Sequence, residues 1–128
     1  MTTKKHVMSM TYPPKIPAVL SGDCSQTIRT GRNVSVGDEI LFHGWSGKPY
    51  RSTWSWRMRV VVTQVTLITM NKYGVQIGHQ FHIWNSLDEL ASLDFIDPPT
   101  GEALRDVLFK LNGIPNEPVP AQIIRWGD

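Results

Sequence analysis

Four aromatic and four basic side chains interleave within one short segment of the chain, residues 45–59. They are Trp45, Tyr50, Trp54 and Trp56, and Lys48, Arg51, Arg57 and Arg59. Aromatic rings stack on unpaired nucleobases, and basic side chains bind the phosphates between them. Each stacked base contributes about 1–3 kcal/mol by alanine substitution. The segment therefore predicts a surface for single-stranded nucleic acid.

The same segment has a second interpretation. In a strand, Trp54, Trp56 and Met58 share one face, and Arg57 and Arg59 share the other. If the tryptophan face is buried, these rings belong to the core, and the arginines form a solvated basic strip. Either interpretation leaves a basic surface on this strand.

The net charge of +2 hides an asymmetry along the chain. Residues 1–80 hold ten Lys/Arg and three acids, for +7, whereas residues 81–128 hold three Lys/Arg and eight acids, for −5. No carboxylate lies between Ile40 and Leu87, where five bases fall. This distribution predicts an anionic partner for the first two-thirds of the chain. The alternative is a basic face neutralised by acidic helices of the same domain.

Composition disfavours several classes of protein. Cys24 is the single cysteine, so no internal disulfide can form, which fits a cytoplasmic location. No apolar run approaches the roughly 20 residues of a membrane span, and no apolar segment follows Lys4 and Lys5 as in a secretory signal. The histidines lack the paired spacing of zinc ligands, and no phosphate-binding glycine loop is present. We therefore expect no metal, no cofactor and no membrane partner.

The elements that must position these residues follow from periodicity. Residues 13–22 predict a short helix that stops at Gly22. Residues 40–43 predict a strand, and the β-branched run over residues 53–70 predicts one strand that bends or two that follow each other. Weaker strands are expected at 73–77 and 80–84, and a last strand at 121–126.

Two further helices are expected in the acidic part. Ser86 and Glu89 form the pattern of a capping box, which would open a helix over residues 86–93. A second helix over residues 100–112 would end at Gly113. Its apolar stripe consists of Leu104, Val107, Leu108 and Leu111.

The domain organisation is simple. Residues 1–10 are polar and aperiodic, and we expect a flexible tail there. Residues 11–128 have the length of a single domain. The order of helix, several strands, two helices and strand predicts an α+β fold, with a curled sheet or small β-barrel and helices packed against it.

The segment VLSGDCSQTIR resembles the opening motif of the ASCH family, which lies within the PUA-like superfamily. That family begins with a short helix, a glycine turn and the pattern G-x-K-x-x-[T/E]-x-R, and Gly22, Thr27 and Arg29 match it here. The lysine position holds Cys24. Three later segments also resemble the family: VGDEILFHGW, ELASLDFID with Asp94, and AQIIRW. The resemblance spans roughly residues 12–126.

This resemblance implies a PUA-like small β-barrel with flanking helices, and most often a role in RNA binding. Some small bacterial members are amidohydrolases that act on acetylated cytidine, and some have been linked to RNA cleavage. The amidohydrolases use a lysine, a threonine and a carboxylate. By position, these would be Cys24, Thr27 and Asp94, and a thiol does not supply the positive charge of the lysine.

Each candidate residue has a chemical and a structural interpretation. Thr27 is a nucleophile if Asp94 acts as its base, and otherwise it satisfies a turn. Cys24 is reactive only if its pKa is depressed, and otherwise it is a buried, inert thiol. Arg29 presents a planar fork for phosphate or a base edge, or else forms an ion pair with Asp38 or Asp94.

Taken together, the residues predict a binding module for single-stranded RNA or a modified nucleotide. The expected contacts are Arg29, Arg32, Trp45, Lys48, Arg51, Trp54, Arg57 and Arg59. The first alternative is an enzyme, an amidohydrolase or a ribonuclease, with Thr27, Asp94 and Cys24 as candidate catalytic residues. The second is a module for a protein partner, which would use the five tryptophans as an exposed patch.

Overall fold

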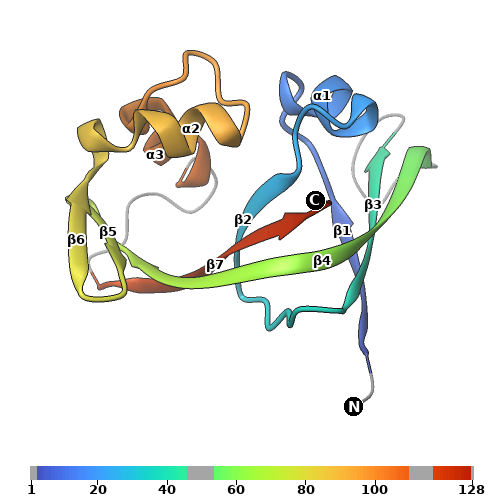
Figure 1. The fold of residues 1–128 in the computed structure, drawn as a ribbon. Coiled ribbons are helices and arrows are strands. Elements are labelled where there is room, and N and C mark those ends of the chain that lie inside the picture. The colour runs from blue at the N-terminus through green and yellow to red at the C-terminus, as the bar shows by residue number, and fades with distance from the viewer. Residues whose placement is uncertain (1–2, 46–53, 110–116, 128) are drawn as a thin grey trace.

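The computed structural model describes residues 3–45, 54–109 and 117–127, without the side chains of Trp45 and Trp54. These residues form seven strands, three α-helices and one 3₁₀ turn (Figure 1). In chain order they are β1 (Lys5–Ser9), α1 (Lys15–Ser21), β2 (Gln26–Thr30), β3 (Glu39–Trp45), β4 (Trp54–Met70), β5 (Gly74–Ile77), β6 (Gln80–Ile83), η1 (Trp84–Ser86), α2 (Asp88–Leu93), α3 (Gly101–Leu108) and β7 (Val119–Trp126).

Strand β4 connects all parts of the sheet. It is one bent strand of 17 residues, rich in the β-branched residues that favour extended backbone. Its first half pairs antiparallel with β3, and its second half pairs antiparallel with β7 and β5. A bulge between Val62 and Gln64 marks the change of partner, and a bulge locally increases strand twist.

The seven strands form a curled sheet that stays open (Figure 1). The main path is β1-β3-β4-β5-β6, while β7 pairs with β4 and β2 pairs with β7. Among the described strands, β1, β2 and β6 each have a single strand neighbour. The sheet and the three helices confirm the predicted α+β class.

The two faces of the sheet carry separate cores. Ile124 of β7 packs in the first core with Val19 of α1 and Phe42 of β3. Ile123 packs in the second core with Ala91 of α2 and Leu104 of α3. Since consecutive residues of a strand point to opposite faces, β7 contributes to both cores. Helix α1 therefore covers one side of the sheet, and α2 and α3 cover the other.

The first ten residues differ from the expected flexible tail. Residues Lys5–Ser9 form β1, which pairs in parallel with β3. Met8 is 0% exposed and Met10 is 3% exposed, and both belong to the first core. An exposed Val7 before the buried Met8 is the alternation of a half-buried strand. The strand is only five residues long, so its alternation does not stand out among polar neighbours.

Asp38 joins β1 to the start of β3. Its carboxylate accepts hydrogen bonds from the backbone N–H of Lys4 (3.0 Å) and of Ser35 (2.9 Å). It also accepts one from His6 Nε2 (2.9 Å). The His6 contact contributes most, and together these bonds lower the pKa of Asp38 to about 2.

We expect Asp38→Asn to remove an acid-sensitive part of the free energy of unfolding. An aspartate in an unfolded chain has a pKa of about 3.9. The folded pKa is depressed, so the contribution of Asp38 is complete above about pH 4 and is lost as the pH falls toward about 2. Urea denaturation should show the wild type more stable than the variant at about pH 6, with a gap that narrows below about pH 4. A gap that does not change with pH would contradict this.

Helices α1 and α3 lie where the sequence predicts helices, although α3 ends before the expected residue 112. Helix α1 ends at Ser21, and Gly22 adopts a left-handed conformation with φ 88°, where glycine has no steric cost. Helix α3 begins after Thr100, whose side chain accepts from the backbone N–H of Ala103. It ends at Leu108, and the expected Leu111 and Gly113 lie outside the described residues.

The predicted capping box at Ser86 is wrong. Ser86 Oγ donates to the carbonyl of Ile83, 2.7 Å away, and so closes the turn η1. Helix α2 begins two residues later, at Asp88, without a side-chain cap. A serine hydroxyl can satisfy a preceding carbonyl as readily as a following N–H, and the sequence pattern does not distinguish the two.

Candidate functional site

A cleft of about 370 Å³ runs along the free edge of β2. Thr27 and Arg29 point into it from β2 itself. Ser9 and Lys15 line it on the side of β1 and α1, and Asp94 at the end of α2 faces them. The volume lies in the range of small-molecule sites. The edge strand β2 therefore lies between two groups of elements whose side chains together line a ligand-sized space.

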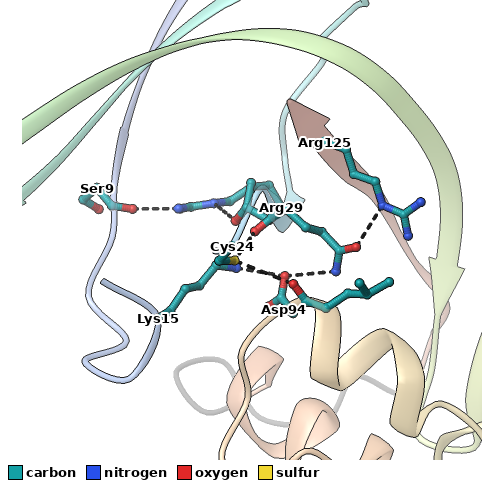
Figure 2. Close-up of polar contacts among 9 residues, drawn as sticks. Ser9, Lys15, Cys24, Arg29, Asp94 and Arg125 are labelled. Atoms are coloured by element: carbon teal, nitrogen blue, oxygen red, sulfur yellow. Dashed lines mark hydrogen bonds and ion pairs between the residues drawn. The ribbon is translucent and has the colours of Figure 1, made fainter. Parts of the chain in front are cut away.

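Arg29 is held in place by two contacts within the cleft. Its Nη2 donates to the carbonyl of Ser9 at 2.8 Å, as Figure 2 shows. Its Nε donates to Thr27 Oγ1 at 3.1 Å. Burial, together with the nearby Arg32, lowers the pKa of Arg29 to about 10. The guanidinium is therefore cationic at neutral pH, in a fixed orientation and close to a second positive charge.

Lys15 and Asp94 form a buried ion pair at the cleft. Lys15 Nζ lies 2.8 Å from Asp94 Oδ1, and each side chain is 6% exposed. Gln26 Nε2 donates to the same oxygen at 3.2 Å. Burial raises the pKa of Asp94, while Lys15 and the hydrogen bond from Gln26 act in the opposite direction. A close cation with good geometry is what allows a carboxylate to be buried here.

Sequence reasoning missed Lys15. The signal was present, because Ala18 and Val19 follow Lys15 by three and four positions and are buried on the same helix face. A lysine on the apolar face of a short helix requires a buried anionic partner. The resemblance implies a lysine at position 24 alone, and it therefore pointed to Cys24 and not to α1.

Cys24 does not line the cleft. It is 0% exposed and belongs to the first core. Its Sγ lies 3.5 Å from the carbonyl oxygen of Gln26 and 3.6 Å from that of Leu93, and the thiol donates to them. Burial raises the pKa of the Cys24 thiol. This is the environment of an inert thiol rather than of a nucleophile.

The tryptophan strand matches the second interpretation of its sequence. Trp56 and Met58 pack against the first core, while Arg57 and Arg59 are exposed. Gly44 on β3 faces Trp56, and a Cβ at that position would collide with the indole. Trp84 is 3% exposed and Trp126 is 6% exposed. The idea of an exposed patch of all five tryptophans is therefore wrong.

The remaining predicted contacts divide into three groups. Arg32 is exposed and lines the cleft, with its Nη2 3.4 Å from the carbonyl of Val7. Trp45 and Trp54 are cross-strand partners in the backbone, with side chains outside the described part. Lys48 and Arg51 lie outside the described residues altogether.

A register row across three strands connects the cleft to the exposed arginines of β4. Ser9, His43 and Arg57 occupy one register row across β1, β3 and β4. Arg29 donates to the Ser9 carbonyl at the near end of this row. Burial lowers the pKa of His43, and Arg29 and Arg57 both add to the effect. Both guanidiniums are thus within electrostatic reach of one imidazole, and Arg59 continues the strip along β4.

The lining of the cleft combines an excess of positive charge with one aromatic residue. Lys15, Arg29 and Arg32 face one carboxylate, Asp94, which leaves an excess of two positive charges. The ring of Tyr12 also lines the cleft, and its hydroxyl accepts from the backbone N–H of Asp97 at 3.0 Å. Within the described part of the chain, no group of three or more His, Cys, Asp or Glu side chains could hold a metal ion.

Comparison with known proteins identifies no relative of this chain. No protein-family model matches the chain, and neither curated proteins nor solved structures give a significant match. In residues 3–45, 54–109 and 117–127, no helix has the length and apolar character needed to cross a bilayer.

Proposed function

We propose that this protein binds single-stranded RNA, with one nucleotide held in the cleft along β2 of a PUA-like fold. The observation that carries the proposal is the convergence of Lys15, Arg29 and Arg32 on a ligand-sized cleft with a single acid. A phosphate near Arg29 and Arg32 would receive charge-assisted hydrogen bonds from two guanidiniums. It would also relieve the repulsion between these two cations.

The cleft also provides for the base. Tyr12 presents an aromatic ring at its wall, and its hydroxyl contact with Asp97 restrains the ring. Ile96 and Val107 add apolar surface nearby. Unpaired bases are commonly held by stacking on an aromatic ring, with contributions of about 1–3 kcal/mol per base. Phosphate and base would thus be recognised by neighbouring parts of one site.

The basic strip supports a strand rather than a free nucleotide. Arg57 and Arg59 are exposed, and the register row through His43 connects Arg57 to the cleft. An RNA strand whose nucleotide occupies the cleft could lay its neighbouring phosphates along this strip. Contacts between arginines and phosphates determine the affinity and its salt dependence, but they do not distinguish one RNA sequence from another.

We expect the affinity for short single-stranded RNA to fall steeply with salt. Each phosphate neutralised on a single strand contributes a slope of about −0.7 in log K against log salt. The double variant Arg57→Ala, Arg59→Ala should therefore weaken binding and reduce the slope by about 1.4. Fluorescence anisotropy of a labelled RNA over a salt series measures both quantities.

The matched control removes two bases elsewhere, Lys72→Ala with Arg105→Ala. Lys72 lies over the ring of Tyr73, and Arg105 pairs with Asp106, and neither lines the cleft. This control has the same net charge as the double variant. If both variants show the same slope of log K against log salt, the loss of affinity results from overall charge and not from the strip of Arg57 and Arg59. Affinity that does not depend on salt would reject the proposal.

Lys15 favours one alternative, hydrolysis of acetylated cytidine. The resemblance implies a catalytic lysine, and Lys15 brings an amine beside Asp94 from another element. In the described residues, however, Asp94 pairs with Lys15 and Gln26, while Thr27 Oγ1 accepts from Arg29. A general base next to Thr27 is therefore not in place, which supports binding over catalysis. Turnover of acetylcytidine that is abolished in Thr27→Ala would reverse this preference.

A further inference from the structure

A second cavity, of about 450 Å³, shares no lining residue with the cleft. It is bounded by Asp23, Ser25, Gln26, Gln64, Ser92, Leu93, Phe95 and Arg125. Gln26 on its wall bonds to Asp94 of the cleft at 3.2 Å. The two spaces thus lie on either side of the Gln26–Asp94 contact, and nothing in the proposed RNA contacts uses the second.

A row of planar polar side chains forms the sheet side of this second cavity. Gln26, Arg125 and Gln64 are register partners on the neighbouring strands β2, β7 and β4. Arg125 Nε donates to Gln26 Oε1 at 2.9 Å, and the two Nη nitrogens extend away from this contact (Figure 2). The bulge in β4 sets Gln64 opposite Arg125. Bulges are frequent where a sheet directs a side chain to a site.

The other walls differ in character. Leu93 and Phe95, at the end of α2, provide an apolar surface. Asp23 brings a carboxylate, whose Oδ2 accepts from Ser21 Oγ at 3.0 Å. Arg125 and Asp23 balance in charge, in contrast to the cationic cleft. A neutral planar ring with polar edges fits this environment better than a phosphate, because no charge excess is available to bind one.

We propose that this cavity binds a guanine base. Guanine offers two adjacent acceptors, O6 and N7, which match the two donors of an arginine fork. It also carries an exocyclic amino group at N2, which can donate to a carboxylate such as Asp23. Adenine has an amino donor where guanine has O6, so it would face Arg125 with a donor against a donor. The pair of Arg125 and Asp23 therefore selects guanine.

The test compares guanosine, inosine and adenosine by calorimetric titration of the full chain. These nucleosides have no phosphate, so the cations of the cleft contribute little to their binding, and the variants at Arg125 and Asp23 assign that binding to the second cavity. We expect guanosine to bind about tenfold or more tightly than adenosine, since one bidentate contact discriminates by that order. Inosine, which has O6 and N7 but not the amino group, should fall between them.

Two variants assign the contacts. Arg125→Met should weaken guanosine binding by about tenfold or more, whereas the matched Arg105→Met, on α3 and outside the lining of both cavities, should not change it. Asp23→Ala should weaken guanosine binding and leave inosine binding unaltered. Melting curves of Arg125→Met show whether the loss of its Gln26 contact has unfolded the protein.

The comparison of nucleosides on the wild type does not depend on any variant. Equal affinity for guanosine and adenosine, or no detectable guanosine binding, would overturn the inference. The inference is also separable from RNA binding in the cleft. A protein that binds guanosine selectively but not RNA would refute the proposed function alone, and the reverse result would refute this inference alone.

Discussion

Arg29→Met is expected to weaken RNA binding by about 30-fold or more, the largest effect of any single change at the cleft. Removal of one partner of a buried, hydrogen-bonded charge pair costs about 2–5 kcal/mol in binding. Arg29 is already oriented by Ser9 and Thr27, so little conformational entropy is lost when it meets a phosphate. Methionine keeps the aliphatic stem and removes only the charged group. Anisotropy titration at fixed salt measures the change.

Two further variants interpret that result. Arg29→Lys retains the charge but has no planar fork, so it should recover only part of the affinity. Arg105→Met, which removes a partly buried arginine of α3 that does not line the cleft, should bind RNA like the wild type. If Arg29→Met and Arg105→Met lose the same small amount of affinity, the cleft is not the binding site.

Lys15→Met is expected to lower the free energy of unfolding at neutral pH by about 3–5 kcal/mol. The variant leaves the Asp94 carboxylate buried without its cation, and such a group is costly. Burial already raises the pKa of Asp94. In the variant, a folded pKa above the unfolded value means a penalty at high pH that disappears as the pH falls and Asp94 gains a proton. Urea denaturation at several pH values measures this dependence.

The double variant Lys15→Met, Asp94→Asn provides the check. The asparagine side chain introduced by the second substitution is neutral and could still accept from Gln26, so the pair is removed without a buried charge. We expect the double variant to be more stable than Lys15→Met at neutral pH, since replacing both members of a buried pair costs less than breaking it. If Lys15→Met loses less than about 1 kcal/mol, the ion pair behaves as a surface pair would, and the description of this site is wrong.

The sequence predicted well those features that depend on local pattern. Thr27 and Arg29 were singled out by one short motif, and they share a face of β2 and meet in the cleft, although no strand was predicted over residues 26–30. The helix before Gly22 and the long β-branched strand were also clear from the sequence alone. Each of these features is determined by the residue pattern of one short segment, so it can be predicted without knowing the rest of the fold.

Other features depend on contacts between distant parts of the chain. Lys15 is explained only by Asp94, which comes from the far end of α2. Strand β1 is defined by its pairing with β3 and not by its own composition. Asp38, in the turn before β3, was considered only as an ion-pair partner of Arg29, although it instead accepts from three donors in two other segments. The hydrophobic periodicity of a single segment does not predict which distant residues it will contact.

The position of Cys24 shows how a motif can mislead. The resemblance implies a lysine there, and the structure places the thiol in the first core instead. A lysine reaches the same carboxylate from α1, one element earlier in the chain. The positive charge next to Asp94 is therefore supplied by Lys15 of α1 and not by position 24. A comparison of position 24 alone would conclude that the lysine is missing.

The place of β7 in the sheet has a consequence for how the protein is made. This strand is the last of the seven in chain order, yet it lies between β2 and β4 and pairs with both. All the other described strands are therefore synthesised before β2 can pair with β7, its only neighbour among them. Until then, the nascent chain has neither the cleft nor the division between its two cores. The pairing of β2 must wait until β7 has been synthesised and has left the ribosome, and the unpaired edges of β2 and β4 are exposed to association during that interval.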